Sequence, residues 1–257
     1  MENQYRAIFV SDIHLGISAW QSALLEKWLK KHKAEKYYLV GDIVDLWKLK
    51  RSWYWPDSHN KLVRRFIKLA EKREVFYIPG NHDSSFRDFV GLKFGGIEVR
   101  EEMIHECADG QKALVIHGDK FDSIVKDSVW LAKIGAIGYE ILFKLNRVIN
   151  ATRRLLGLKR YWSLSAAVKK RVKNAVKYIG RYEETIVEYT KQQGVQNVVC
   201  GHIHQSNIQN INGVQYINCG DFVESMTLVV EHFDGRFEII SFTDNEVKTF
   251  SEDEEQV

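Results

Sequence analysis

The chain has 257 residues, of which 45% are hydrophobic and 28% charged, and its formal net charge is +3. This composition is typical of a globular protein and excludes a disordered or collagen-like chain. No uninterrupted apolar run approaches the ~18 residues of a membrane-spanning helix. Three cysteines without a CxxC pair favour reduced thiols, and the first residues lack a secretory signal pattern. We therefore expect a cytoplasmic protein.

The N-terminal half alternates short apolar segments with amphipathic ones. Strands are expected at 7–10, 37–40 and 75–78, and helices at about 22–32 and 61–72. This β-α-β-α-β order predicts parallel strands that are covered by helices.

The second half adds strands at 113–116 and 198–200, separated by a helical region from about 124 to 181. Two hairpins are expected at Asn212-Gly213 and Asp234-Gly235. The fold class is therefore α/β, a sandwich of two mixed β-sheets with outer helices. We expect a core made of residues 1–122 and 186–250, a basic helical cap inserted at 123–185, and an acidic tail at 251–257.

Five of the expected strands end in clusters of polar residues. Binding sites in open α/β sheets lie at the carboxyl ends of strands, so we expect the clusters to meet. They offer oxygen and nitrogen ligands without a thiolate, which suits Mn²⁺, Fe²⁺ or Zn²⁺ better than Ca²⁺. One cluster alone would be an ordinary turn, but the set suffices for two ions sharing a carboxylate, an arrangement suited to phosphoryl displacement. The clusters are Asp12-x-His14, Gly41-Asp42, Gly80-Asn81-His82-Asp83, His117 and Gly201-His202-x-His204.

In this order the motifs resemble those of the calcineurin-like metallophosphoesterase superfamily, over roughly residues 5–122 and 186–245. The resemblance implies a hydrolase with two divalent ions, manganese being expected and iron or zinc the alternatives. It implies one ion held by Asp12, His14, Asp42 and His204, and another held by Asp42, Asn81, His117 and His202. It also implies that His82 is the catalytic histidine, oriented by Asp83, with Asp45 as a further partner.

Within the superfamily the chain resembles the branch of UDP-2,3-diacylglucosamine hydrolases in its length, its helical insertion and its Gly220-Asp221-aromatic element. That resemblance implies cleavage of a lipid A precursor to UMP and an acylated sugar 1-phosphate. One position departs, because the branch carries Arg where this chain has His82; Arg clamps phosphate, whereas His also moves protons. Two alternatives therefore stay open: a phosphodiesterase or phosphatase for nucleotides or nucleic acid, and a non-catalytic scaffold.

The segment 144–181 carries twelve basic residues and no acidic one, interleaved with apolar residues at helical spacing. Basic amphipathic helices bind anionic lipid, so we expect a peripheral contact with the inner face of the cytoplasmic membrane. Nucleic acid is the alternative anion, and helices that pack together with a solvated basic face are the alternative without a partner. A nearby aromatic loop either walls an apolar or sugar-nucleotide pocket or packs on itself; it holds Trp47, Trp53, Tyr54 and Trp55.

Overall fold

The computed structural model describes residues 4–122, 164–242 and 248–250. The chain divides into two compact units, Met1–Asp119 with Ile186–Val257, and Lys120–Thr185. Most of the expected cap, including residues 123–163 of it, and the expected acidic tail at 251–257 lie outside the described residues. The domain limits inferred from the sequence therefore stay predictions, as does the membrane contact through 144–181.

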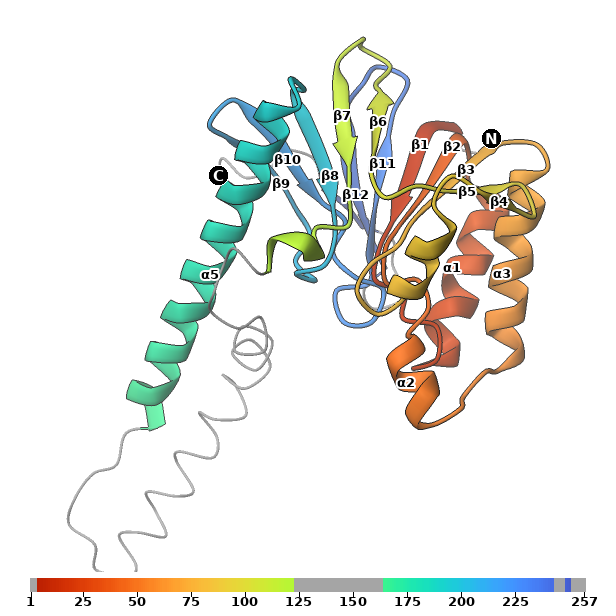
Figure 1. The fold of residues 1–257 in the computed structure, drawn as a ribbon, viewed down its shortest axis with the longest axis horizontal. Helices are drawn as coiled ribbons and strands as arrows, with labels where there is room; N and C mark the ends of the chain where they lie inside the picture. Colours follow the sequence, from red (N-terminus) through yellow and green to blue (C-terminus); the bar gives the residue numbers. More distant parts are fainter. Residues whose placement is uncertain (1–3, 123–163, 243–247, 251–257) are drawn as a thin grey trace, which may run out of the picture. The chain divides into compact units, whose positions relative to one another are not determined.

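The first unit contains two mixed β-sheets, as the sequence predicts (Figure 1). The larger sheet has eight strands in the order β13-β12-β11-β1-β2-β3-β5-β4. Strands β1, β2, β3 and β5 run parallel, and the remaining strands pair antiparallel. The bounds are β1 Gln4–Val10, β2 Lys33–Val40, β3 Glu74–Ile78, β4 Lys93–Phe94, β5 Ile97–Val99, β11 Thr227–Glu231, β12 Phe237–Ser241 and β13 Lys248–Phe250.

The smaller sheet has five strands in the order β6-β7-β8-β10-β9, with parallel pairs at its centre and antiparallel edges. Both predicted hairpins are confirmed. Asn212 and Gly213 join β9 to β10 with φ of 52° and 84°, the left-handed backbone that a two-residue hairpin turn requires. The bounds are β6 Met103–Glu106, β7 Lys112–Val115, β8 Asn197–Cys200, β9 Asn207–Ile211 and β10 Val214–Asn218.

Two long helices, α1 (Ala19–Lys31) and α3 (Asp57–Ala70), contact each other and cover one face of the larger sheet (Figure 1). Shorter elements follow two of its strands: α2 (Leu46–Arg51) after β2, and the 3₁₀ helix η1 (Ser84–Phe89) after β3. A second 3₁₀ helix, η2 (Asp119–Phe121), and helix α5 (Leu164–Gln192) complete the described elements. None of the described helices has the length and apolar content to cross a bilayer.

Strands β1 and β2 bury successive side chains on opposite faces, as the pleat dictates. Ile8 and Tyr37 belong to the apolar cluster beneath α1 and α3, whereas Phe9 and Tyr38 belong to the cluster between the two sheets. The rings of Phe9 and Tyr38 stack with centroids 4.7 Å apart. Burial of each such side chain stabilises the fold by ~1.5–3 kcal/mol. The strand ends that carry the polar clusters are therefore held on a rigid frame.

Candidate metal centre

The five polar clusters follow the carboxyl ends of β1, β2, β3, β7 and β8. The first three strands are parallel neighbours in the larger sheet, and the last two are parallel neighbours in the smaller sheet. A backbone hydrogen bond links the loops after β7 and β8, since Gly201 N donates to His117 O at 3.1 Å. His202 N donates to Asp12 Oδ2 at 2.9 Å, which joins the two sheets at this edge. Residues 190 positions apart thus enter one site.

One group of candidate ligands consists of Asp12, His14 and His204, each offering an atom within 4.8 Å of the others. His204 Nε2 lies 2.9 Å from Asp12 Oδ1, and His14 Nε2 lies 3.7 Å from the same oxygen. The two imidazole Nε2 atoms are 3.4 Å apart. Nitrogen atoms and a carboxylate oxygen that converge in this way fit a divalent ion.

A second group consists of Asp42, His117 and His202, again within 4.8 Å of one another and all buried. His117 Nε2 lies 3.5 Å from Asp42 Oδ2. The same oxygen of Asp42 lies 4.0 Å from His14 Nε2 in the first group. Asp42 therefore stands between the two groups, where a bridging carboxylate would be placed.

Asn81 is a candidate ligand of the second group because its side-chain oxygen has no hydrogen-bond partner among the described residues. Its Oδ1 is buried and makes no hydrogen bond to any described residue, which is costly for an amide oxygen. The neighbouring Gly80 lies against the group, because a Cβ there would come within 2.3 Å of Asp42 Oδ1 and 2.6 Å of His117 Nε2. A buried acceptor beside these ligands suits a hard cation.

Hydrogen bonds orient the imidazole rings so that Nε2 faces the centre. His117 Nδ1 lies 2.9 Å from Val40 O, so Nδ1 carries the proton and the Nε2 lone pair points away from the backbone. His14 Nδ1 faces a carboxylate instead of a carbonyl, with Asp45 Oδ2 at an ion-pair distance of 3.4 Å. Metal-ligating histidines have this arrangement, with the second nitrogen donating to a carbonyl or carboxylate.

The loops are shaped by an unusual backbone conformation. Seven described residues other than glycine have positive φ, and five of them are candidate ligands: Asp12, His14, Asp42, His202 and His204. This conformation costs an ordinary residue roughly 1–2 kcal/mol. Bonds between loops hold it in place, among them Asp12 N to Gly41 O at 3.0 Å and His14 N to Asp42 O at 2.9 Å. Strain of this kind is typical of functional sites.

The charges of the site shift the pKa values of its groups. Burial would raise the pKa of Asp12, but His204 and His14 hold it well below its usual range. Burial would lower the pKa of His14, but Asp12 and Asp45 raise it to about 9. Burial also opposes protonation of His117, yet Asp42 and Asp12 raise its pKa to about 10. Such a carboxylate-rich pocket attracts cations, and a divalent ion would displace the imidazole protons.

His82 lies beside the two groups and contacts Asp45, the further partner named from the sequence, instead of Asp83, which was expected to orient it. Its Nδ1 is 3.1 Å from Asp45 Oδ1, and its ring packs edge-on against His14. Asp83 turns into the protein, where it accepts from Gly80 N at 2.6 Å and from the Tyr77 hydroxyl. Adjacent residues in the turn point in different directions, so sequence proximity to His82 did not identify its partner.

Trp47 and Ser11 also contribute to the site. The Trp47 ring lies 4.2 Å from the His82 ring, while half of its own surface stays exposed. The sequence left open whether this aromatic segment walls a pocket or packs on itself; Trp47 contacts His82, whereas Trp53 stacks on Trp55. Ser11 donates to Val40 O at 2.6 Å and to the Asp12 carboxylate, and it packs where a Cβ at Gly201 would clash. Its role had no signal in the sequence, because serine at a strand end is common.

The calcineurin-like phosphoesterase family model matches residues 5–206, which is most of the chain. The chain belongs to the calcineurin-like phosphoesterase family. It is a metal-dependent phosphoester hydrolase, as the motifs predicted, and the alternative of a non-catalytic scaffold is set aside. The family membership also confirms the predicted fold class.

Relatives of this calcineurin-like phosphoesterase carry the name UDP-2,3-diacylglucosamine hydrolase. The protein of Aliivibrio fischeri is 25% identical over 244 residues, which cover 88% of this chain and 94% of that protein. The protein of Porphyromonas gingivalis is 26% identical over 156 residues, so the chain matches about half, 54%, of that protein's length. Among solved structures, the phosphoesterase Yfce from E. coli aligns with 95% of this chain and 98% of its own, at 16% identity and a TM-score of 0.48.

Proposed function

We propose that the two groups hold a pair of divalent ions, manganese first among them, bridged by Asp42. The observation that supports this is the place of Asp42 Oδ2, 4.0 Å from His14 Nε2 and 3.5 Å from His117 Nε2. Asp12, His14 and His204 complete the first site, and Asn81, His117 and His202 complete the second. Bound ions would activate water and neutralise charge on the phosphorus centre.

His82 acts as the proton donor in this proposal. Because Nδ1 faces Asp45, Nε2 is the atom that can protonate the leaving oxygen. The side chain is 24% exposed, so a substrate can reach it. Asp45 keeps the ring in this orientation, and Trp47 limits its rotation from one side. Asp83 positions the turn that carries His82, through Gly80 N, instead of contacting the ring.

The proposed substrate is a UDP-2,3-diacylglucosamine-like lipid, cleaved at its pyrophosphate to UMP and an acylated sugar 1-phosphate. The names and near full-length matches of the relatives support this choice. A lipid-linked substrate would place the enzyme at the cytoplasmic face of a membrane. The basic segment 144–181 would supply positive charge for a peripheral contact with anionic lipid.

The test is hydrolysis of UDP-2,3-diacylglucosamine in mixed micelles with Mn²⁺, followed by chromatography for UMP. Asp42→Asn, purified in parallel, is the matched control and should release no UMP. Bis-p-nitrophenyl phosphate serves as a general phosphodiester. Cleavage of this ester without UMP release would reject the lipid substrate but keep the reaction. If the manganese-loaded wild type neither releases UMP nor cleaves bis-p-nitrophenyl phosphate, the two-metal assignment is rejected.

One observation supports a second candidate, a phosphodiesterase or phosphatase for nucleotides or nucleic acid. His82 occupies the position where the resembling branch has Arg, and a proton donor there serves substrates with a poor leaving group. Rates for cyclic nucleotides, dinucleotides and single-stranded oligonucleotides should be compared with the lipid under the same conditions. A kcat/KM for a nucleotide substrate more than tenfold above that for the lipid would favour this candidate.

A further inference from the structure

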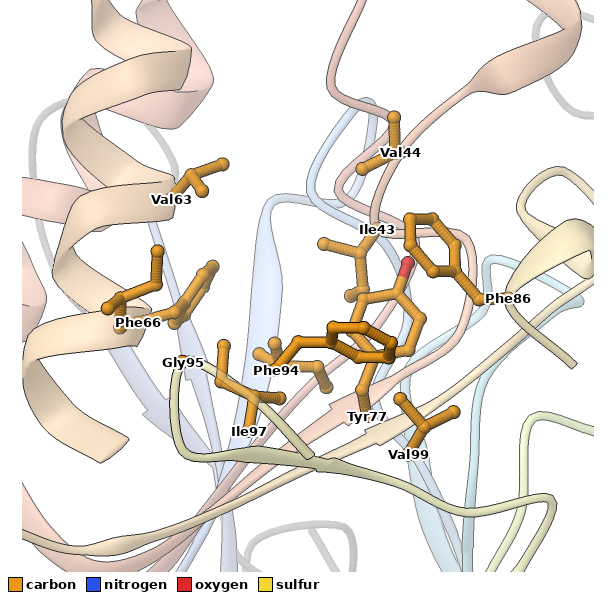
Figure 2. A pocket seen from close by; sticks show the side chains of 12 residues that line it. Ile43, Val44, Val63, Phe66, Tyr77, Phe86, Phe94, Gly95, Ile97 and Val99 are labelled. Carbon is orange, nitrogen blue, oxygen red and sulfur yellow. The ribbon is translucent and has the colours of Figure 1, made fainter. Parts of the chain in front are cut away.

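A cavity of about 300 Å³ lies in the first unit, on the helix-covered face of the larger sheet (Figure 2). Val63 and Phe66 project into it from α3 on one side, and Val44 and Phe86 lie on the other, with Tyr77 and Phe94 between them. The sheet closes the bottom of the cavity. It is distinct from the candidate metal centre, none of whose ligands lines it.

The walls of the cavity are apolar. Its twelve lining residues are apolar or aromatic side chains and one glycine, and the only polar side-chain atom is the Tyr77 hydroxyl. That hydroxyl is already bound to Asp83. A space without free donors or acceptors does not hold ordered water, but it does hold apolar molecules. The occupant that fits these walls is therefore a hydrocarbon group.

The cavity opens to solvent where α3 meets the turn between β4 and β5. Ile67 and Phe94 line it, yet they are 38% and 49% exposed. Phe89 extends this apolar mouth, because its ring lies 5.4 Å from that of Phe94 and is 41% exposed. Exposed apolar side chains gathered at the mouth of a cavity are typical of a ligand entrance.

Helix α3 carries exposed positive charge near the mouth of the cavity. Arg64 and Lys68 are both exposed, and Arg64 lies three positions before Ile67, so Arg64 and Ile67 are neighbours on the helix surface. Other cations of this helix are paired, as Lys61 is with Asp57 at 2.8 Å. Arg64 and Lys68 form no ion pair with any residue in the described part of the chain. An anionic head group is complementary to this surface.

The size of the cavity limits the length of the occupant. An apolar cavity of about 150 Å³ accommodates benzene, which has six carbon atoms. A cavity of about 300 Å³ would thus take roughly ten. We propose that it binds the alkyl chain of a medium-chain fatty carboxylate, with the carboxylate at the mouth near Arg64 and Lys68.

This site lies directly behind the loop that carries Asp42. The side chains of Ile43 and Val44 line the cavity, while their backbone amides donate to Asp83 Oδ2 at 2.8 and 3.3 Å. Asp83 also holds Gly80, next to Asn81. A bound chain therefore contacts the residues that fix two of the metal-site loops. The inference goes beyond the proposed function and does not depend on the substrate.

The test is calorimetric titration of sodium decanoate, below its micelle concentration, into the metal-loaded protein. Val63→Trp fills the cavity from α3, and Ile104→Trp is the matched control, since Ile104 is 40% exposed and outside the cavity. We expect decanoate to bind the wild type and Ile104→Trp with equal affinity, and Val63→Trp at least tenfold more weakly. Butyrate, which carries the same carboxylate on a short chain, should not bind measurably.

A second variant keeps the test decisive if Val63→Trp does not fold, as judged by its thermal melting. Ile67→Glu alters only the exposed mouth and places a negative charge beside the expected carboxylate, so it should weaken decanoate binding more than decanol binding. Equal binding of decanoate by the wild type and both cavity variants would overturn the proposal. So would equal affinity for butyrate and decanoate, which would place the ligand at the metal centre, or no binding of decanoate by the wild type.

Discussion

Replacement of Asp45 by asparagine tests how the metal-site histidines are oriented. One carboxylate oxygen of Asp45 lies 3.4 Å from His14 Nδ1, and the other lies 3.1 Å from His82 Nδ1 and accepts from Lys48 N at 2.8 Å. Asparagine can keep the oxygen that caps α2 and faces His82. Its NH₂ group then faces His14 Nδ1, which must become an acceptor. The proton of His14 moves to Nε2, the atom proposed to bind metal.

The expected effect is a loss of metal affinity with an intact fold. Changes in groups that orient metal-ligating histidines typically reduce affinity 10–100-fold, or about 1.4–2.7 kcal/mol. The pKa of Asp45 supports a charged role, because burial would raise it but hydrogen bonds from His14 and His82 hold it far below its usual range. The assay is hydrolysis of bis-p-nitrophenyl phosphate against Mn²⁺ concentration, with the metal midpoint and the plateau rate reported separately.

Asp57→Asn is the matched control, since Asp57 is an exposed carboxylate paired with Lys61 at the start of α3. It should leave the metal midpoint and the plateau unchanged. Asp45→Asn should shift the midpoint at least tenfold and also lower the plateau, because His82 loses its negatively charged partner. An Asp45→Asn variant with wild-type midpoint and plateau would refute the orientation argument.

Three further predictions follow from named contacts. His82→Ala should lower kcat for the phosphodiester ~10²–10⁴-fold while the bound metal, measured by atomic absorption, stays at the wild-type level; parallel loss of metal would contradict a purely proton-transfer role. Gly41→Ala should lower the free energy of unfolding, measured in urea, by roughly 2–4 kcal/mol, because φ is +76° and the added Cβ would lie 2.2 Å from His117 Nδ1. Gly110→Ala is the control. Its φ is +85° but the space around it is open, so it should show only the backbone cost of roughly 1–2 kcal/mol. Glu26→Gln should cost up to ~1 kcal/mol at pH 7. Burial would raise the pKa of Glu26, but its partners Lys30 and Arg65 lower it. The stability that Glu26 contributes is therefore present above pH ~4.3 and is lost as pH falls through the lowered pKa of the folded state. A stability difference between wild type and Glu26→Gln that persists at pH 2 would contradict this.

Much of the fold could be predicted because the strands are strong local signals. Runs such as Val75–Ile78 are buried on both faces and therefore remain apolar throughout, and Asn212-Gly213 specifies a tight turn. The edge elements η1, β4 and β5 were not predicted. Strands β4 and β5 have only two and three residues on either side of Gly95-Gly96, and η1 is a 3₁₀ helix of six residues. Segments this short give no periodic pattern. The cavity beneath α3 depends on these elements, so it could not be foreseen either.

The candidate ligands could be predicted as a set, but their supporting contacts could not. Five polar clusters after five strands identify a shared site, because parallel strands bring their carboxyl ends together. The pairing of His82 with Asp45, 37 positions earlier, depends on how two loops cross in space. The sequence favoured the adjacent Asp83 and gave Asp45 only as a further partner. The direction of each side chain decides which carboxylate contacts His82. Hydrogen bonds set this direction, such as that from His82 N to Asp42 Oδ1 at 2.8 Å.

The backbone of the site explains why such bonds matter for function. Aspartate and histidine at positive φ leave no trace in the sequence, unlike glycine, because neither residue requires that conformation. Five candidate ligands adopt it, at a combined cost of several kcal/mol by the value of roughly 1–2 kcal/mol per residue. Loop-to-loop hydrogen bonds offset part of this cost, and a bound ion would offset more, since it binds only the folded arrangement. Removal of the metal should therefore loosen the loops after β1, β2 and β8 before the strands, and hydrogen exchange of Asp12 and His14 amides, compared with that of Phe9, measures this directly.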